Sequence, residues 1–145
     1  MTKNKVKLII IFCFLFLAGV KLFACEFTYT ITDPAGKTVR VVPGTQILLT
    51  AGDTYTLTAV YKEDHNNCKV PAEDTLFLVE EERWKENKDY LALRLESSTN
   101  WSLPARRTHS VSFTFTAVKP GTWIMDVIRE CTKGGYKEKL IFSVT

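Results

Sequence analysis

The first 24 residues contain no aspartate or glutamate, and this absence determines how the charge of the chain must be interpreted. Lys3, Lys5, Lys7 and Lys21 all lie in this stretch. Residues 25–145 therefore hold 15 Lys plus Arg against 16 Asp plus Glu, a net charge of −1, although the formal charge of all 145 residues is +3. Nucleic-acid-binding domains need a basic face, so we expect no nucleic-acid partner.

The N-terminus also lacks an apolar run long enough to span a membrane. Leu8–Val20 has 13 residues, whereas a spanning helix needs about 20. The run follows the basic segment Met1–Lys7 and has the length of a secretory h-region. We therefore predict a signal peptide over 1–24 and an exported mature chain over 25–145. An uncleaved signal anchor is the alternative, which the short run disfavours.

The segment Leu22-Phe23-Ala24-Cys25 resembles a bacterial lipobox, in which Leu and Ala precede a cysteine that becomes lipidated. Ala24 also suits cleavage by an ordinary signal peptidase. The sequence predicts a mature chain that starts at Cys25, with Cys25 as the lipidation site. The expected location is the cell envelope, the periplasm or the cell surface, with a lipid anchor in the membrane.

Cysteine is scarce, with four in the whole chain, and Cys13 leaves with the signal peptide. The remaining three are an odd number, which in an oxidising compartment calls for a chemical cap or an intermolecular partner. If Cys25 carries lipid, Cys68 and Cys131 can form one disulfide. Metal ligation by His65, Cys68 and Cys131 is the alternative, but zinc sites usually use tighter pairs such as C-x-x-C.

No sustained apolar stripe at helical spacing occurs, and only 80–88 suggests a short helix or a charged turn. Apolar residues instead alternate with Thr or Ser in Phe27–Thr32, Tyr55–Tyr61 and Val111–Ala117. Further strands are expected at Thr38–Val42, Thr45–Leu49, Thr75–Glu80, Tyr90–Glu96, Thr122–Glu130 and Lys139–Val144, with Gly- and Pro-containing turns between strands. This pattern predicts an all-β, immunoglobulin-like Greek-key β-sandwich of about seven to nine strands in one domain.

The strand positions also predict which side chains form the core and which loops share an end. The expected core is Phe27, Tyr29, Ile31, Leu57, Ala59, Leu76, Leu78, Leu91, Leu93, Phe113, Phe115, Trp123, Met125, Val127, Leu140 and Phe142. In such a sandwich the B–C, D–E and F–G loops emerge together. Strands B to G are expected at Thr54–Lys62, Thr75–Glu80, Tyr90–Glu96, Val111–Ala117, Thr122–Glu130 and Lys139–Val144. The three loops are therefore expected at Glu63–Asp74, Ser97–Ser110 and Cys131–Glu138.

Motifs of catalysis and of cofactor binding are missing. There is no G-x-S-x-G nucleophile elbow and no G-x-x-x-x-G-K phosphate loop, and a bridged Cys68 could not act as a nucleophile. We therefore expect no enzyme, no cofactor and no resident metal. A site made by His65, His109 and Asp64 would support the alternative of a periplasmic metal-binding protein.

Binding is the better supported function. Trp101, Tyr136, Arg106 and Arg107 are residue types enriched at recognition hot spots, and all four fall in the expected loops. His65, Asn66, Asn67 and His109 complete the candidate surface. The sequence thus predicts a binding or accessory module for a protein or other extracytoplasmic ligand.

The stretch Phe113–Glu130 resembles the E–F hairpin of many secreted bacterial immunoglobulin-like domains. One secreted bacterial family of this kind, with 64–68 (DHNNC) and 134–136 (GGY) as local hallmarks, would fit the sequence best, and the resemblance implies no activity. The stretch Phe113–Glu130 is also similar to the matching part of chagasin-type cysteine-peptidase inhibitors, which use the same three loops as a wedge. That resemblance implies a peptidase inhibitor as an alternative function. The inhibitors' loop motifs have no counterpart in 65–71, 97–110 or 129–131, so no inhibitory residue is transferred.

Overall fold

The structure is a computed structural model that describes residues 25–63, 68–97, 99–131 and 134–145. The expected signal peptide 1–24 and the candidate residues His65, Asn66 and Asn67 lie outside the described residues. In the described part of the chain there is no α-helix, and a short 3-10 helix at Ala72–Asp74 is the one helical element.

Eleven strands make up the described structure, more than expected because two short strands, β6 and β8, lie in segments predicted as a turn and a loop. The strands are β1 (Cys25–Thr32), β2 (Thr38–Val41), β3 (Gln46–Leu49), β4 (Thr54–Glu63), β5 (Leu76–Val79), β6 (Glu82–Arg83), β7 (Leu93–Leu95), β8 (Trp101–Ala105), β9 (Thr108–Ala117), β10 (Gly121–Arg129) and β11 (Tyr136–Val144).

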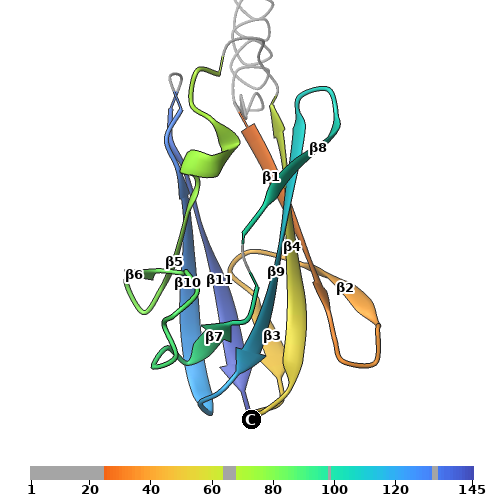
Figure 1. Cartoon of the computed structure of the whole chain (residues 1–145), viewed down its shortest axis with the longest axis vertical. Helices are drawn as coiled ribbons and strands as arrows, with labels where there is room; N and C mark the ends of the chain where they lie inside the picture. Colours follow the sequence, from red (N-terminus) through yellow and green to blue (C-terminus); the bar gives the residue numbers. More distant parts are fainter. Residues whose placement is uncertain (1–24, 64–67, 98, 132–133) are drawn as a thin grey trace, which may run out of the picture.

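The strands form two sheets that pack face to face (Figure 1). One has the order β2-β1-β4-β9-β7, with β8 also paired to β9, and the other has the order β3-β11-β10-β5-β6. With β1, β4, β5, β7, β9, β10 and β11 as strands A to G, these are the ABED and CFG sheets of an immunoglobulin-like sandwich. The predicted fold class is confirmed.

Threonine residues account for the strand formation and the outer face of the sheet that contains β1, β4 and β9. In β1, β4 and β9 every second residue is apolar and buried, and the residues between them are mostly Thr or Ser on the outer face. Their hydroxyl groups bond across strands, with Thr54 and Thr116 at 3.0 Å and Thr58 and Ser112 at 2.9 Å. β-Branched residues on a pleated face favour this conformation, so the pattern fixes both the strands and the side that faces the core.

The predicted core is largely confirmed but wrong at three positions. Leu76, Leu78 and Trp123 are only partly buried, whereas Phe77 and Val79 point inward. Residues 75–79 (TLFLV) show no alternation, so the pattern cannot distinguish the two faces of β5. The register with β10 determines which face of β5 points inward, because Phe77 and Val79 lie opposite the buried residues Val127 and Met125 of β10.

The segment 80–88 forms the strand β6 and turns rather than a helix. Glu80 and Glu81 have positive φ angles of 52° and 67°, which interrupt any helix. Trp84, which the predicted core does not include, is 3% exposed, and its indole N–H donates to the Leu93 carbonyl at 2.7 Å. It packs against Phe113 and Phe115 and closes the core between the sheets.

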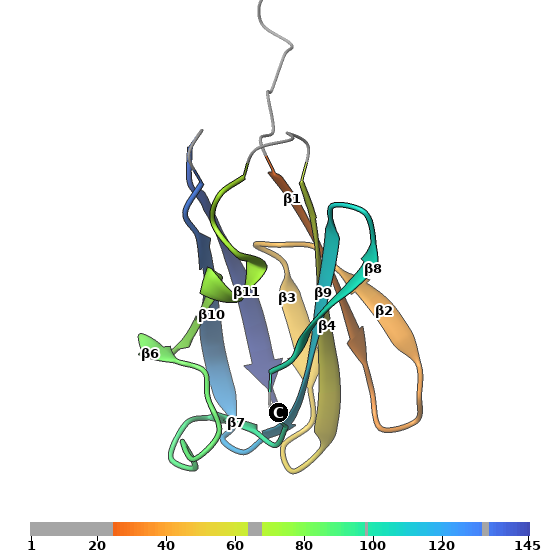
Figure 2. The ribbon, with the colours of Figure 1, turned by 45° about the horizontal axis from the view of Figure 1, so that its top comes forward.

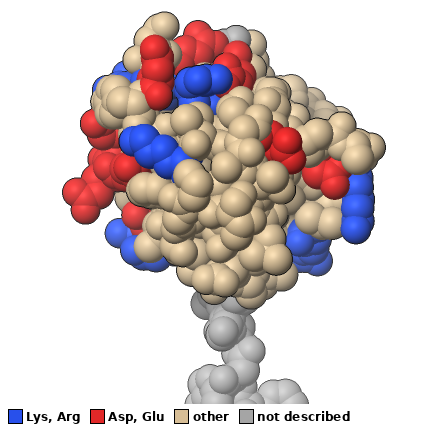
Figure 3. Space-filling model, turned by 90° about the horizontal axis from the view of Figure 1, so that it is seen from below, with Lys and Arg blue, Asp and Glu red and all other residues tan. Residues whose placement is uncertain are grey.

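One end of the sandwich gathers the B–C, D–E and F–G connections, as predicted, and we call it the loop end (Figure 2). The D–E connection contains β8, which runs back along β9 and turns at 105–108. The first residue of β1, Cys25, lies at this end too, opposite Glu63 of β4. The other end is shown in Figure 3, where charged side chains lie around the edge and uncharged residues fill the middle.

Candidate functional site

Three cysteines that are far apart in sequence meet inside the loop end. The Cys131 sulfur lies 4.0 Å from the Cys25 sulfur and 4.0 Å from the Cys68 sulfur. Cys25 is 6% exposed, and the other two are partly buried. We call these cysteines, together with Tyr61 and Arg129, the thiol cluster.

The strands β1, β4 and β10 each contribute one residue to the cluster, and each residue continues the inward-facing series of its strand. Cys25 continues the inward series Phe27, Tyr29 and Ile31 of β1 by one step. Tyr61 is the last buried residue of β4, and Arg129 is the last inward residue of β10. The cluster therefore caps the core of the sandwich where the strands end.

Tyr61 is central to the cluster. Its hydroxyl group lies 2.9 Å from the Cys25 sulfur and donates to the Cys68 sulfur at 3.9 Å. A hydroxyl that donates to Cys68 can still accept the Cys25 S–H. The Tyr61 ring also packs on Phe27, with the ring centroids 5.0 Å apart. The hydroxyl therefore links two sulfurs for which no direct contact is seen.

Arg129 is the other organising residue, and its side chain is 1% exposed. Its guanidinium lies over the Tyr61 ring, donates to the carbonyl groups of Val70 at 2.6 Å and Pro71 at 2.7 Å, and approaches the Cys68 sulfur at 3.6 Å. No carboxylate among the described residues pairs with it. Backbone carbonyls, the Thr75 hydroxyl group and a π face therefore compensate the charge of this buried cation, while its Nε–H has no hydrogen-bond partner in the described part of the chain.

The surroundings of Cys25 and Cys68 shift the pKa values of their thiols in opposite directions. Burial raises the pKa of Cys25 to about 11, even though the Tyr61 hydroxyl acts in the other direction. Burial opposes ionisation of Cys68 too, but the Val70 backbone, Tyr61 and Arg129 outweigh it and lower the pKa of Cys68 below its usual value. At neutral pH, Cys25 is the thiol that holds its proton and Cys68 the one readier to become a thiolate.

The structure brings the predicted pair together without a bond. No disulfide joins any two of the three cysteines in the described ranges, and the 4.0 Å from Cys68 to Cys131 compares with about 2.05 Å for a disulfide. The pairing therefore stays a prediction. The sequence did not indicate that Cys25 lies equally near to Cys131.

The predicted binding residues occupy different surroundings. Arg106 and Arg107 are exposed at the turn between β8 and β9. Trp101 lies in β8 and is partly buried against the core. His109 is in β9, where its Nε2 lies 3.1 Å from a Glu63 carboxylate oxygen and its ring stacks on Tyr61.

Tyr136 belongs to β11 rather than to a loop, and it too is partly buried against the core. Its ring packs on Phe27 at 4.9 Å between centroids. It lines a hollow with Cys25, Glu26, Phe27 and Glu138. Tyr136 thus packs on Phe27 and His109 on Tyr61, whereas Arg106 and Arg107 are exposed.

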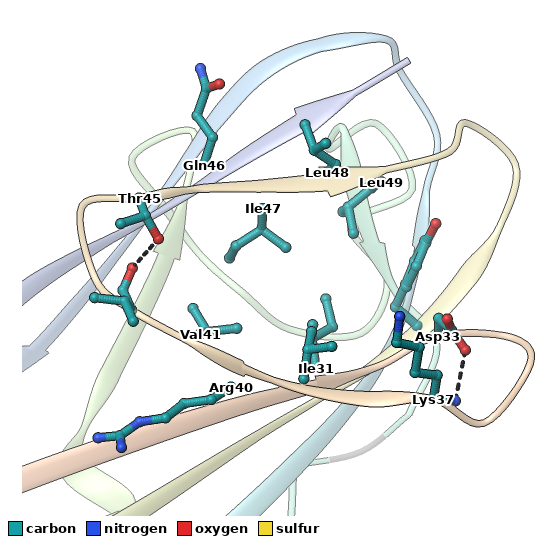
Figure 4. Close-up of a pocket in the computed structure, with 13 residues that line it drawn as sticks. Ile31, Asp33, Lys37, Arg40, Val41, Thr45, Gln46, Ile47, Leu48 and Leu49 are labelled. Atoms are coloured by element: carbon teal, nitrogen blue, oxygen red, sulfur yellow. Dashed lines mark hydrogen bonds between the residues drawn. The ribbon is translucent and has the colours of Figure 1, made fainter.

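A second hollow, of about 270 Å³, lies away from every predicted site residue (Figure 4). It opens between β2 and β3, where the chain crosses from one sheet to the other. Ile31, Val41 and Ile47 point into it, and the backbone turn at its rim is closed by Thr45 Oγ1, which donates to the Val42 carbonyl at 2.7 Å. Its apolar interior is an extension of the core, and the charged residues that line it are Asp33, Lys37 and Arg40.

Within the described residues, no group of three or more His, Cys, Asp or Glu is arranged to hold a metal ion. His65, which the metal alternative needs, lies outside them. A search of the same residues finds no helix with the length and apolar character of a membrane span.

A scan against protein-family models and a search of the curated proteins give no match. Among solved structures, domains 4 and 5 of the S-layer protein SbsC are similar over 88% of this chain and 79% of that chain, with 10% sequence identity and a TM-score of 0.33. A similarity at this level carries no argument about function.

Proposed function

We propose that this chain is an exported, non-catalytic binding module, anchored by lipid at Cys25, whose loop end binds an extracytoplasmic partner at the membrane surface. The observation that carries the proposal is that Cys25 opens β1 at the same end as the three connecting loops. A lipid on Cys25 would hold that end beside the membrane. A rigid scaffold that gathers loops at one end is a common design for recognition.

The anchor is tested by the mass of the exported protein. We expect loss of residues 1–24 and added acyl mass on Cys25, with the protein in the membrane fraction. Cys25→Ser should release it into the soluble fraction. A different start site, or an unmodified Cys25 in a soluble mature protein, would contradict the anchor.

The binding face is tested with a photo-crosslinking amino acid placed at Leu103, which is 63% exposed on β8 beside the loop end. The matched control is Val39, which is 44% exposed on the edge strand β2. In intact envelopes, a discrete adduct is expected from position 103 and not from position 39. Equal adducts from both positions, or none, would exclude the loop end as the binding face.

The predicted Cys68–Cys131 disulfide belongs to this proposal, because it would tie the B–C connection to the F–G connection. The sulfurs are already adjacent at 4.0 Å, and persistent disulfides form in oxidising compartments. Peptide mapping of the exported protein without reductant tests for the bond.

Two alternatives stay predictions with their own tests. Titration of a papain-like peptidase with the exported protein tests the inhibitor function, and absence of inhibition at micromolar protein removes it. Metal analysis of the purified protein tests the metal-binding function.

A further inference from the structure

We propose that the thiol cluster is an internal thiol–disulfide exchange site, in which the Cys131 sulfur bonds to Cys68 or to Cys25. The geometric basis is that Cys131 has two thiol neighbours at the same distance, 4.0 Å. Only one of them can bond to Cys131 at a time, so the third sulfur remains a thiol that can displace it. The inference goes beyond the proposed function and applies to the chain whose Cys25 does not carry lipid, because the exchange needs a free Cys25 thiol.

The first bond forms where an oxidant can reach. Cys68 and Cys131 are partly exposed, whereas Cys25 is buried. The Cys68 thiolate attacks the disulfide of a small-molecule or protein oxidant, and one thiol of the oxidant leaves. The Cys131 sulfur then attacks Cys68 in this mixed disulfide and releases the second thiol. The oxidant's disulfide is reduced to two thiols, and Cys68 and Cys131 are oxidised to one disulfide.

The exchange step needs no further oxidant. The Cys25 sulfur attacks the Cys131 sulfur, the bond from Cys25 to Cys131 forms, and the bond from Cys131 to Cys68 breaks with its electron pair on Cys68. One disulfide and one thiol are present before and after the step.

The proton has a path through Tyr61. The hydroxyl lies 2.9 Å from Cys25 and 3.9 Å from Cys68, so it can take the proton that Cys25 loses and donate to the sulfur that leaves. The Arg129 guanidinium, 3.6 Å from Cys68, stabilises negative charge on that leaving sulfur. Tyr61 and Arg129 thus assist the release of the Cys68 sulfur when Cys25 attacks Cys131. They also assist the ionisation of Cys68 when Cys68 attacks in the reverse step.

Attachment of a lipid to the Cys25 sulfur through a thioether would stop the exchange. A thioether has no thiol to ionise, so a chain with this lipid could form only the bond from Cys68 to Cys131. The site therefore links lipid attachment at the start of β1 to the choice of disulfide between the loops.

The test uses the full chain with Cys13→Ser, made in a cell-free system with detergent and reductant, so that it is neither processed nor acylated. The reduced chain is exposed to glutathione disulfide, samples are alkylated at intervals, and the pairs are mapped by mass spectrometry. We expect two intramolecular disulfides, from Cys131 to Cys68 and from Cys131 to Cys25. After removal of the oxidant, their ratio should keep changing until it is constant.

Two variants serve as matched controls. Cys25→Ser should form only the bond between Cys68 and Cys131, and Cys68→Ser only the bond between Cys25 and Cys131. Tyr61→Phe should still form both bonds but slow the change in their ratio by about a hundredfold. A three-cysteine chain that forms one pair only, forms none, or keeps its first ratio unchanged would overturn the proposal. Because this chain is never exported, the result is independent of the mass measurement that tests export.

Discussion

The Arg129 guanidinium carbon lies 4.2 Å from the centroid of the Tyr61 ring, in the closed interior where β4 and β10 end. This contact joins the two sheets, since β4 belongs to one and β10 to the other. The guanidinium also holds the B–C connection through two backbone carbonyls. The pair therefore links the core of the sandwich to its loop end.

Replacing Arg129 tests how much its buried contacts contribute to the free energy of unfolding. Arg129→Met fills a similar space but leaves the Val70 and Pro71 carbonyls without their donor, so we expect the free energy of unfolding to fall by about 3 kcal/mol. Urea denaturation measures this change. Arg40→Met on the exposed face of β2 is the control and should cost less than about 0.5 kcal/mol. Equal losses from both variants would show that the Arg129 contacts contribute nothing.

Alkaline pH should destabilise the reduced protein. Burial raises the pKa of Cys25 to about 11 and raises the pKa of Tyr29 and Tyr61 above their usual range. Groups whose pKa is higher in the folded state stabilise it below their unfolded pKa, about 9 to 10, and lose this contribution as pH rises through the folded value.

Urea denaturation with reductant should therefore give a free energy of unfolding that falls from about pH 9 to about pH 11. Cys68 has the opposite sign, because its lowered pKa adds stability that is complete above its unfolded pKa and lost as pH falls. Cys25→Ser should make the alkaline decline shallower, whereas Cys68→Ser should leave its slope above about pH 9 unchanged and remove a gain in stability below that pH. A free energy that is constant over this range would contradict the burial of these groups.

Trp84→Phe removes the hydrogen bond of Trp84 together with part of its buried ring. The buried Leu93 carbonyl loses its donor and a cavity is left, so we expect a loss of about 3 kcal/mol in thermal or urea unfolding. Trp123→Phe is the control, since its indole donates to the Lys119 carbonyl at an exposed position. A larger cost at Trp123 than at Trp84 would argue against the buried position of Trp84.

Gly121 is required by its backbone conformation. Its φ is +134°, and an added Cβ would meet the Trp123 ring at 3.3 Å. Gly121→Ala should lower the free energy of unfolding by about 1–2 kcal/mol. Gly135→Ala, where the nearest atom is an Arg129 carbonyl at 3.5 Å, should change it by less than about 0.5 kcal/mol. A neutral Gly121→Ala would show that β10 starts differently.

The oxidised protein should depend more on Cys131 than on Cys68. A disulfide that closes a loop of about 60 residues stabilises by roughly 4 kcal/mol in the chain-entropy model. Cys131→Ala removes every pairing, whereas after Cys68→Ala the unacylated chain can still join Cys25 to Cys131. The unfolding free energies without reductant should therefore differ by about 2–4 kcal/mol. Equal losses of unfolding free energy in Cys131→Ala and Cys68→Ala would show that Cys25 does not replace Cys68 as the partner of Cys131.

The sequence predicts the fold well where polar and apolar residues alternate. In 27–32 and 111–117 the Thr and Ser residues mark the outer face, and both segments are strands with the expected side inward. The run 75–79 lacks this mark, so the prediction placed Leu76 and Leu78 inside in place of Phe77 and Val79. Only the pairing with β10 decides the register there.

The same alternation of polar and apolar residues predicts the inward position of part of the thiol cluster. Alternation extended one step back from Phe27 places Cys25 inside, and extended one step on from Val127 places Arg129 inside. A lone basic residue at an inward position is a signal that the prediction did not use. The approach of the Tyr61 hydroxyl to the Cys25 and Cys68 sulfurs depends on how the two sheets pack, which no single strand encodes.

The crossing of the chain between β2 and β3 has a mechanical consequence. Cys25 lies at the loop end and Thr145 at the other (Figure 1). Between them, β3 runs parallel to β11 over Gln46–Leu49 and Ile141–Val144. A pulling force applied between Cys25 and Thr145 would slide β11 along β3, loading their hydrogen bonds together rather than one after another. The sandwich is therefore built to resist tension along its long axis.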